Sequence, residues 1–122
     1  MIVYKTDDFY IEAHESQIPW LKIFTTTVYK ELTDVPPPLR KKLYTLMEII
    51  EEEMIAYYKP EKINIAAFGN YLPHVHIHVM ARFKEDSHFP EPMWGQKQRE
   101  ANLLLPSHEC FYSKLVNRIK LL

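Results

Sequence analysis

The chain has 122 residues, a length typical of one domain, and it is 47% hydrophobic and 25% charged. Its formal net charge of −1 argues against a general binder of nucleic acids or of anionic membranes. The single cysteine excludes an internal disulfide framework, and the two glycines exclude the glycine-rich phosphate loops of P-loop and dinucleotide-binding proteins.

The N-terminal part of the chain predicts β-structure. Residues 1–8 show no basic and apolar leader, and no apolar run approaches the ~18 residues that span a bilayer, so we expect a single cytoplasmic domain over 1–122. Apolar and polar residues alternate in places over 2–14, which predicts one or two strands broken at 6–8. The segment 20–28 is rich in β-branched and aromatic residues and predicts another strand.

A long amphipathic helix is predicted in the middle of the chain. Asp34 followed by three prolines at 36–38 is a helix-start signal. Apolar residues then recur at spacings of three and four: Leu39, Leu43, Leu46, Ile50, Met54 and Tyr57. Pro60 ends the pattern, because proline disrupts a helix interior.

A β-hairpin is predicted after the helix. Residues 62–68 form its first strand, closed by Gly69 and Asn70, and a short turn leads into a second strand over 74–83. A hairpin requires antiparallel pairing, so the sheet is expected to be antiparallel.

The rest of the chain predicts a loop and a helical tail. Residues 84–95 are polar and contain proline, which is typical of a loop. From Gln96 onward we expect helix, with Ser107 as a cap and Phe111, Leu115 and Ile119 as its packed stripe. The predicted fold is therefore α+β, with about five antiparallel strands, one long helix and a C-terminal helical tail.

Three histidines stand at alternate positions in the sequence Pro73-His74-Val75-His76-Ile77-His78-Val79. On a strand they share one face, roughly 6.6 Å from neighbour to neighbour. The outer pair is then roughly 13 Å apart, too far to share one metal ion whose ligands lie near 2.1 Å. A metal site would need two of them and a distant ligand, for which His14, His88 and Glu85 are available.

The arrangement suits phosphate chemistry better. A neutral imidazole is a good nucleophile near neutral pH, and adjacent imidazoles disfavour each other's protonation. A central nucleophile with flanking donors matches attack on phosphorus through a phosphohistidine-type intermediate.

The histidine segment also forms a longer motif. His74 to Met80 follow the pattern His-φ-His-φ-His-φ-φ, where φ is apolar, with Gly69 to His74 before it and Met80-Ala81-Arg82 after it. The motif resembles that of the histidine triad (HIT) nucleotide hydrolases and transferases, with their Gly-Gln-Ser/Thr-φ-x-His approach and Pro-Arg exit. The close resemblance covers about residues 62–95, and the order of elements extends it over the first sixty residues.

The resemblance implies an activity and a set of roles. His76 would take a nucleoside monophosphate from a dinucleoside polyphosphate or a nucleoside phosphoramidate, as a covalent nucleotidyl-histidine, and release it to water or another acceptor. His78 and Asn70 would contact the α-phosphate, and His74 would orient His76. Such enzymes need no protein-bound metal or other cofactor, although magnesium can accompany the nucleotide. They are usually homodimers with the long helix at the interface, and neither nucleic acid nor membrane is an expected partner.

Four positions depart from the family pattern. Asn70 and Tyr71 replace Gln and Ser/Thr, and Pro19 and Thr27 stand where a basic segment of the family has two histidines. Two other functions stay open, the second of them because of the departures at Tyr71, Pro19 and Thr27. One is a non-catalytic metal-binding protein that uses two of the alternate histidines, and the other is a degenerate nucleotide-binding interaction module.

Structural roles are expected for the other reactive or polar residues. Cys110 is expected to be a small buried hydrophobe, and His14 and His108 ordinary surface residues. Arg82 either steers phosphate or pairs with an acid, and Asn64 makes a structural hydrogen bond in preference to a nucleoside contact. Trp94 is expected to plug the core or a dimer interface, the alternative being that its loop closes over a substrate.

Overall fold

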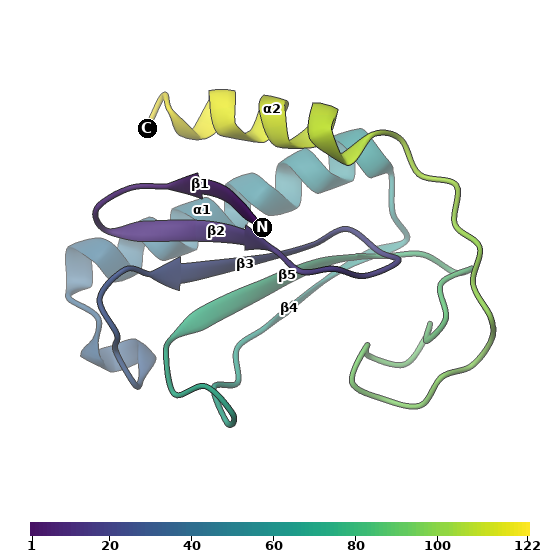
Figure 1. The fold of residues 1–122 in the computed structure, drawn as a ribbon, viewed down its shortest axis with the longest axis horizontal. Helices are drawn as coiled ribbons and strands as arrows, with labels where there is room; N and C mark the ends of the chain where they lie inside the picture. The colour runs from purple at the N-terminus through teal and green to yellow at the C-terminus, as the bar shows by residue number, and fades with distance from the viewer.

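The computed structural model describes residues 1–122 and consists of one antiparallel sheet with helices on one side (Figure 1). The five strands lie in the order β1-β2-β3-β5-β4. The elements are β1 (Ile2–Lys5), β2 (Phe9–Ala13), β3 (Trp20–Thr25), the short 3₁₀ helix η1 (Leu32–Asp34), α1 (Pro37–Tyr58), β4 (Lys62–Ala66), β5 (His76–Arg82) and α2 (His108–Ile119). This architecture confirms the predicted α+β fold. Neither α-helix is long and apolar enough to cross a membrane.

The two faces of the sheet have different roles. α1 packs behind the sheet in Figure 1, and α2 lies beside α1 and β1. Alternate strand residues face these helices and join a core of 19 buried residues, among them Ile11, Leu21, Ile23, Val79 and Ala81. The opposite face is free of helices. The register places Lys22 opposite His78 and Phe24 opposite His76, so the histidines share that open face with side chains of β3.

The long helix begins differently from the prediction. Asp34 does not cap α1, because its carboxylate accepts a hydrogen bond from the Glu31 N–H at 3.0 Å within the 3₁₀ turn. Pro36 is the N-cap of α1. At the other end Lys59, in the left-handed conformation with φ 51°, terminates the helix before Pro60.

The triad strand is shorter than predicted, since β5 begins at His76 and not at His74. The Val75 N–H donates to the Tyr29 carbonyl outside the sheet, at 2.8 Å, which separates His74 from the strand pairing. The preceding connection turns at Gly69, whose φ of +83° is a conformation that favours glycine.

The helical tail also begins later than predicted, at His108 and not near Gln96. Residues 96–106 have no regular structure, because they run along the loop after β5: the N–H groups of Gln98 and Arg99 both donate to the Ser87 carbonyl, at 2.7 and 3.1 Å. The predicted cap is confirmed, as the Ser107 hydroxyl accepts from the Cys110 N–H at 3.3 Å.

Candidate active site

His76 is the first residue of β5, and its ring is held by one hydrogen bond and one stacked aromatic ring. The Nδ1–H donates to the backbone carbonyl of His74 at 2.7 Å. The ring also stacks on Phe24, with centroids 4.7 Å apart and planes within 17°. With Nδ1 carrying the proton, Nε2 keeps its lone pair and faces the cavity, which is the state a nucleophile requires.

His74 lies behind His76 and not beside it. Its side chain is buried, and its Nε2–H donates to the backbone carbonyl of Thr25 at 2.6 Å. The expectation that all three histidines lie on one strand is therefore wrong, since His74 precedes β5 and only His76 and His78 line the cavity. It fixes its own backbone carbonyl, which in turn fixes the ring of His76.

His78 is held in the opposite tautomer to His76. The indole Nε1–H of Trp20 donates to His78 Nδ1 at 3.0 Å, so Nδ1 is an acceptor and the proton lies on Nε2. Burial, and to a smaller extent the neighbouring His76, Lys22 and His14, together lower the pKa of His78 to about 4. At neutral pH His78 is thus an uncharged hydrogen-bond donor next to His76, with ring centroids 4.8 Å apart.

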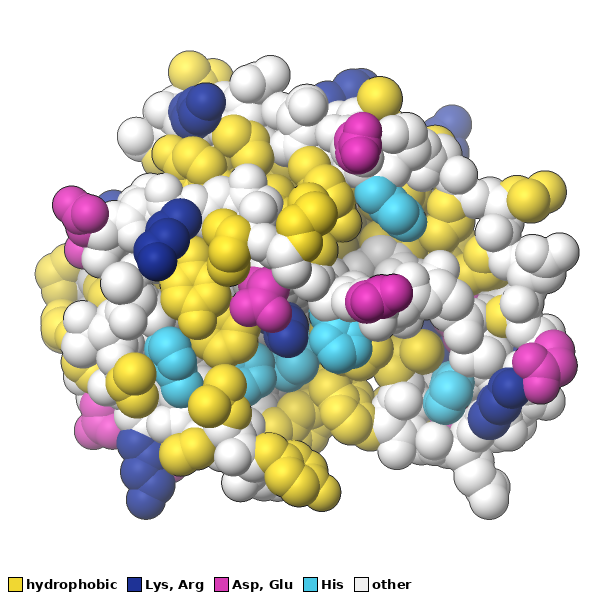
Figure 2. All heavy atoms as spheres, in the orientation of Figure 1, with side chains coloured by type: hydrophobic (Ala, Val, Ile, Leu, Met, Phe, Trp, Pro, Cys, Tyr) yellow, Lys and Arg dark blue, Asp and Glu magenta, His cyan; other side chains and the backbone are white.

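These two histidines line a cavity of about 490 Å³ on the open face of the sheet. Figure 2 shows histidine and hydrophobic side chains gathered around a hollow on this face. The lining residues are His14, Trp20, Lys22, Phe24, Phe68, Gly69, Asn70, Tyr71, Leu72, His76, His78 and Trp94. A cavity of this size with few polar groups among aromatic walls is typical of small-molecule sites.

The predicted phosphate ligand Asn70 lies at the mouth of this cavity, exposed to solvent. Tyr71 beside it is 104% exposed, so its hydroxyl makes no contact with the triad in this structure. Pro19 and Thr27, the positions of the missing family histidines, do not line the cavity. The β3 residues between them do, because alternate side chains of that strand face the triad.

A charged pair stands next to the histidines. Lys22 Nζ lies 3.5 Å from Glu12 Oε1 across β2 and β3, and the Lys22 side chain is only 17% exposed. His14, expected to be an ordinary surface residue, packs on Trp20 with ring centroids 4.1 Å apart and lines the cavity. Burial lowers the pKa of His14, and the charge of Lys22 lowers it further.

Trp20, Lys22 and Phe24 were missed by the sequence reasoning. They could have been found only from the register of β3 against β5. That register requires knowing which strands pair, which the sequence pattern does not give. Trp94 was expected in the core or an interface, but it is 49% exposed and lines the cavity. Trp94 therefore does not plug the core, while its burial in a dimer interface and the closure of its loop over a substrate stay predictions.

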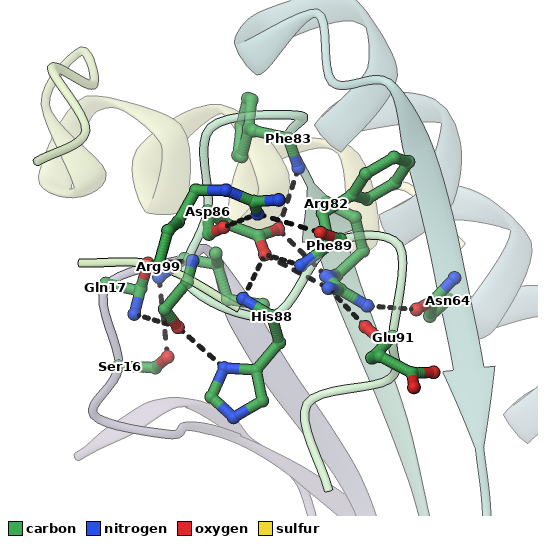
Figure 3. A network of polar contacts seen from close by, with 12 residues as sticks. Ser16, Gln17, Asn64, Arg82, Phe83, Asp86, His88, Phe89, Glu91 and Arg99 are labelled. Atoms are coloured by element: carbon green, nitrogen blue, oxygen red, sulfur yellow. Dashed lines mark hydrogen bonds and ion pairs between the residues drawn. The ribbon is translucent and has the colours of Figure 1, made fainter. Parts of the chain in front are cut away.

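The polar residues around the end of β5 have structural roles. Arg82 is buried and pairs with Asp86, with Nε 2.9 Å from Oδ2, and donates to Asn64 Oδ1 at 2.8 Å (Figure 3). Arg82 is therefore not available to steer phosphate, and Asn64 makes the predicted structural bond. Burial tends to raise the pKa of Asp86, but hydrogen bonds from Arg82 and nearby backbone N–H groups lower it to about 2.

Two expectations about the C-terminal helix are wrong. Cys110 is exposed and not buried, because the inward stripe of α2 consists of Phe111, Leu115 and Ile119. His108 is not an ordinary surface residue, since its Nδ1 lies 2.5 Å from the hydroxyl of Tyr58 on α1. Both α2 features lie outside the triad cavity.

No group of three or more His, Cys, Asp or Glu side chains is arranged to hold a metal ion. The distant ligands considered above do not complete a site with the alternate histidines. His88, for example, hydrogen-bonds through Nδ1 to the Ser87 hydroxyl at 2.6 Å. The metal-binding alternative therefore has no third ligand in this fold.

Comparison with known proteins agrees with this geometry. Residues 1–85 match the model of the HIT domain. A histidine triad protein from Bradyrhizobium japonicum is 26% identical, with a TM-score of 0.79, over 98% of this chain and 90% of that one. One from Sinorhizobium meliloti is 24% identical, with a TM-score of 0.78, over 96% and 87%.

A more distant structure has a similar fold. It is a hypothetical histidine triad nucleotide-binding protein from Sulfolobus tokodaii, 12% identical, with a TM-score of 0.59, over 98% of this chain and 80% of that one. None of the curated proteins matches this sequence. The family match covers most of the chain, including the alternate histidines, and the chain therefore belongs to the HIT domain family.

Proposed function

We propose that this protein is a nucleotide hydrolase or nucleotidyl transferase that acts at the α-phosphate of a nucleoside. Its substrates are dinucleoside polyphosphates or nucleoside phosphoramidates, and His76 forms a covalent nucleotidyl intermediate. The observation that carries the proposal is the pair of opposite tautomers: His76 presents a bare Nε2 and His78 a protonated one to the same cavity. The nucleotide-binding title of the Sulfolobus tokodaii protein supports the ligand class.

The first step follows from these tautomers. The Nε2 lone pair of His76 attacks the α-phosphorus, a P–N bond forms, and the bond from phosphorus to the leaving group breaks. The leaving group departs with the bonding electrons and takes a proton from solvent. Positive charge develops on the His76 ring, and the His74 carbonyl, 2.7 Å from Nδ1, stabilises it.

In the second step His76 Nε2, the nucleophile of the first step, becomes the leaving atom. Water or another acceptor attacks the phosphorus and loses a proton to solvent, the P–N bond breaks, and His76 regains its neutral form while the nucleoside monophosphate leaves. In this proposal the Nε2–H of His78 and the amide of Asn70, which both line the cavity, donate to the phosphate oxygens throughout. No protein-bound metal takes part in this proposal, although magnesium can enter with the nucleotide.

The covalent intermediate is tested by intact mass. The protein is mixed with an adenosine phosphoramidate or a diadenosine polyphosphate, quenched in alkali within seconds and weighed. We expect an acid-labile adduct of one nucleoside monophosphate, absent from His76→Ala. His108→Gln, which removes a histidine outside the cavity, is the matched control and should keep the adduct.

Other outcomes select other functions. Nucleotide binding without adduct or product from either substrate would mean an interaction module. Bound metal without nucleotide binding would mean that the alternate histidines form a metal site after all.

The assembly proposed with this function is a cytoplasmic homodimer. The proposed interface is formed by β4, an edge strand of the sheet, and by α1. Both carry exposed apolar side chains, Ile65 (42%) on β4 and Tyr44 (40%) and Ile55 (50%) on α1. Light scattering should give twice the chain mass of 14.6 kDa, and Ile65→Lys should shift it toward the monomer. A monomeric wild-type protein would contradict the proposed dimer, and cell fractionation tests the location.

A further inference from the structure

The loop that follows β5 is organised around one carboxylate. Asp86 is 0% exposed and accepts hydrogen bonds from Arg82 Nε and Nη2, at 2.9 and 3.0 Å. It also accepts from the backbone N–H groups of Phe83, His88 and Phe89, at 2.9, 3.1 and 2.8 Å (Figure 3). One side chain therefore closes the loop on itself and ties it to the end of the triad strand.

Further bonds fix this loop to the rest of the sheet. Arg82 Nη2 donates to the Glu91 carbonyl at 2.6 Å. Gln17, in the connection from β2 to β3, donates to the Ser87 hydroxyl at 2.7 Å and accepts from the Ser87 N–H at 3.0 Å. Because the anchors reach both β5 and the β2–β3 connection, the loop is held in place before any ligand binds.

Trp94 stands at the end of this anchored loop. Its ring makes edge-to-face contacts with His78, Trp20 and Phe68, with centroids 5.0, 5.2 and 4.7 Å apart. Yet it is 49% exposed and lines the cavity. A large aromatic ring that is firmly placed but left half open offers a surface for another planar group.

We propose that Trp94 is a specificity-determining residue whose ring stacks on the nucleobase of the bound nucleoside monophosphate. Arg82 and Asp86 are positioning residues that hold it there. The inference rests on the proposed function, because it places the base next to a phosphate bound by His78. Stacking accepts any base, and a purine offers a larger π surface than a pyrimidine, so the site favours purine nucleotides.

The test separates the base from the phosphate and sugar. Calorimetric titration compares adenosine 5′-monophosphate with ribose 5-phosphate, which lacks the base. We expect Trp94→Ala to weaken binding of the nucleotide by roughly five- to hundredfold, the range for one stacked base, and to leave ribose 5-phosphate unchanged. Trp94→Phe should keep most of the preference, and Leu104→Ala, at a site 94% exposed and outside the cavity, should keep all of it.

Asp86→Asn tests the positioning role, with near-UV circular dichroism to show that the variant is folded. We expect it to lower the preference for the nucleotide over ribose 5-phosphate without changing the affinity for ribose 5-phosphate. An unchanged preference in the folded variant would overturn the positioning role.

The remaining outcomes separate the stacking proposal from the function beneath it. If the wild type binds no adenosine 5′-monophosphate, the proposed function itself fails, and this inference fails with it. If the wild type binds but Trp94→Ala keeps the same affinity, only the stacking is overturned. Equal losses for both ligands would also overturn it, because Trp94 would then act on the phosphate through His78.

Discussion

The buried ion pair behind the triad predicts a stability loss that depends on pH. Asp86→Asn removes the negative charge beside Arg82, while the amide keeps the shape of the side chain. The carboxyl pKa is lowered from 3.8 to about 2 in the folded protein. By linkage the charge then stabilises the fold by about 2 kcal/mol at pH 7, and we expect Asn to lose that amount. For 122 residues this corresponds to a melting temperature about 8 °C lower.

The sign of the pH dependence follows from the direction of the shift. The folded pKa is depressed, so the contribution is complete above the unfolded pKa of 3.8 and disappears as the pH falls through about 2. The gap between wild type and Asp86→Asn should therefore close as the pH falls, to about half its neutral value at pH 3. Urea unfolding at pH 7, 5 and 3 measures it.

A matched control separates this pair from surface charge. Glu100→Gln removes one partner of the Lys97–Glu100 pair, whose Glu100 side chain is 91% exposed, and should change the free energy of unfolding little. The reasoning is refuted if the gap for Asp86→Asn is below about 0.5 kcal/mol at pH 7, which is the level of an ordinary surface substitution. A gap that stays constant from pH 7 to pH 3 would refute it equally.

Three further substitutions test the site and the tail. Trp20→Phe removes the indole N–H that holds His78 in one tautomer. The pKa of His78 should therefore rise from about 4 in an NMR titration, and kcat/KM should fall about tenfold. An unchanged pKa would contradict the hydrogen bond from Trp20 to His78. Lys22→Met removes a cation opposite His78. We expect kcat/KM to fall about tenfold for a diadenosine polyphosphate and much less for a substrate with an uncharged leaving group. Equal kcat/KM values for wild type and variant would mean that Lys22 only pairs with Glu12. Ser107→Ala removes the cap of α2 and should lower the melting temperature by about 4 °C, with no change in activity.

Local pattern was sufficient for most of the fold and for the choice of the triad. The apolar stripe of α1, the β-rich segments and the Ser107 cap are properties of neighbouring residues, and the structure confirms them. The alternate histidines were identified by their spacing and by their resemblance to a known motif. Sequence left Arg82 open between phosphate and an acid, and the structure pairs it with Asp86.

Only the tertiary structure decided the position of His74 and the tautomer of His78. His74 left the strand because a backbone carbonyl of β3 accepts its ring N–H, and the tautomer of His78 depends on Trp20, 58 positions earlier in the chain. The segment 96–106 was misjudged for the same reason, since the N–H groups of Gln98 and Arg99 are bound by the Ser87 carbonyl and not by their neighbours in sequence. Contacts between residues far apart in the chain follow from strand order and register, which no local pattern contains.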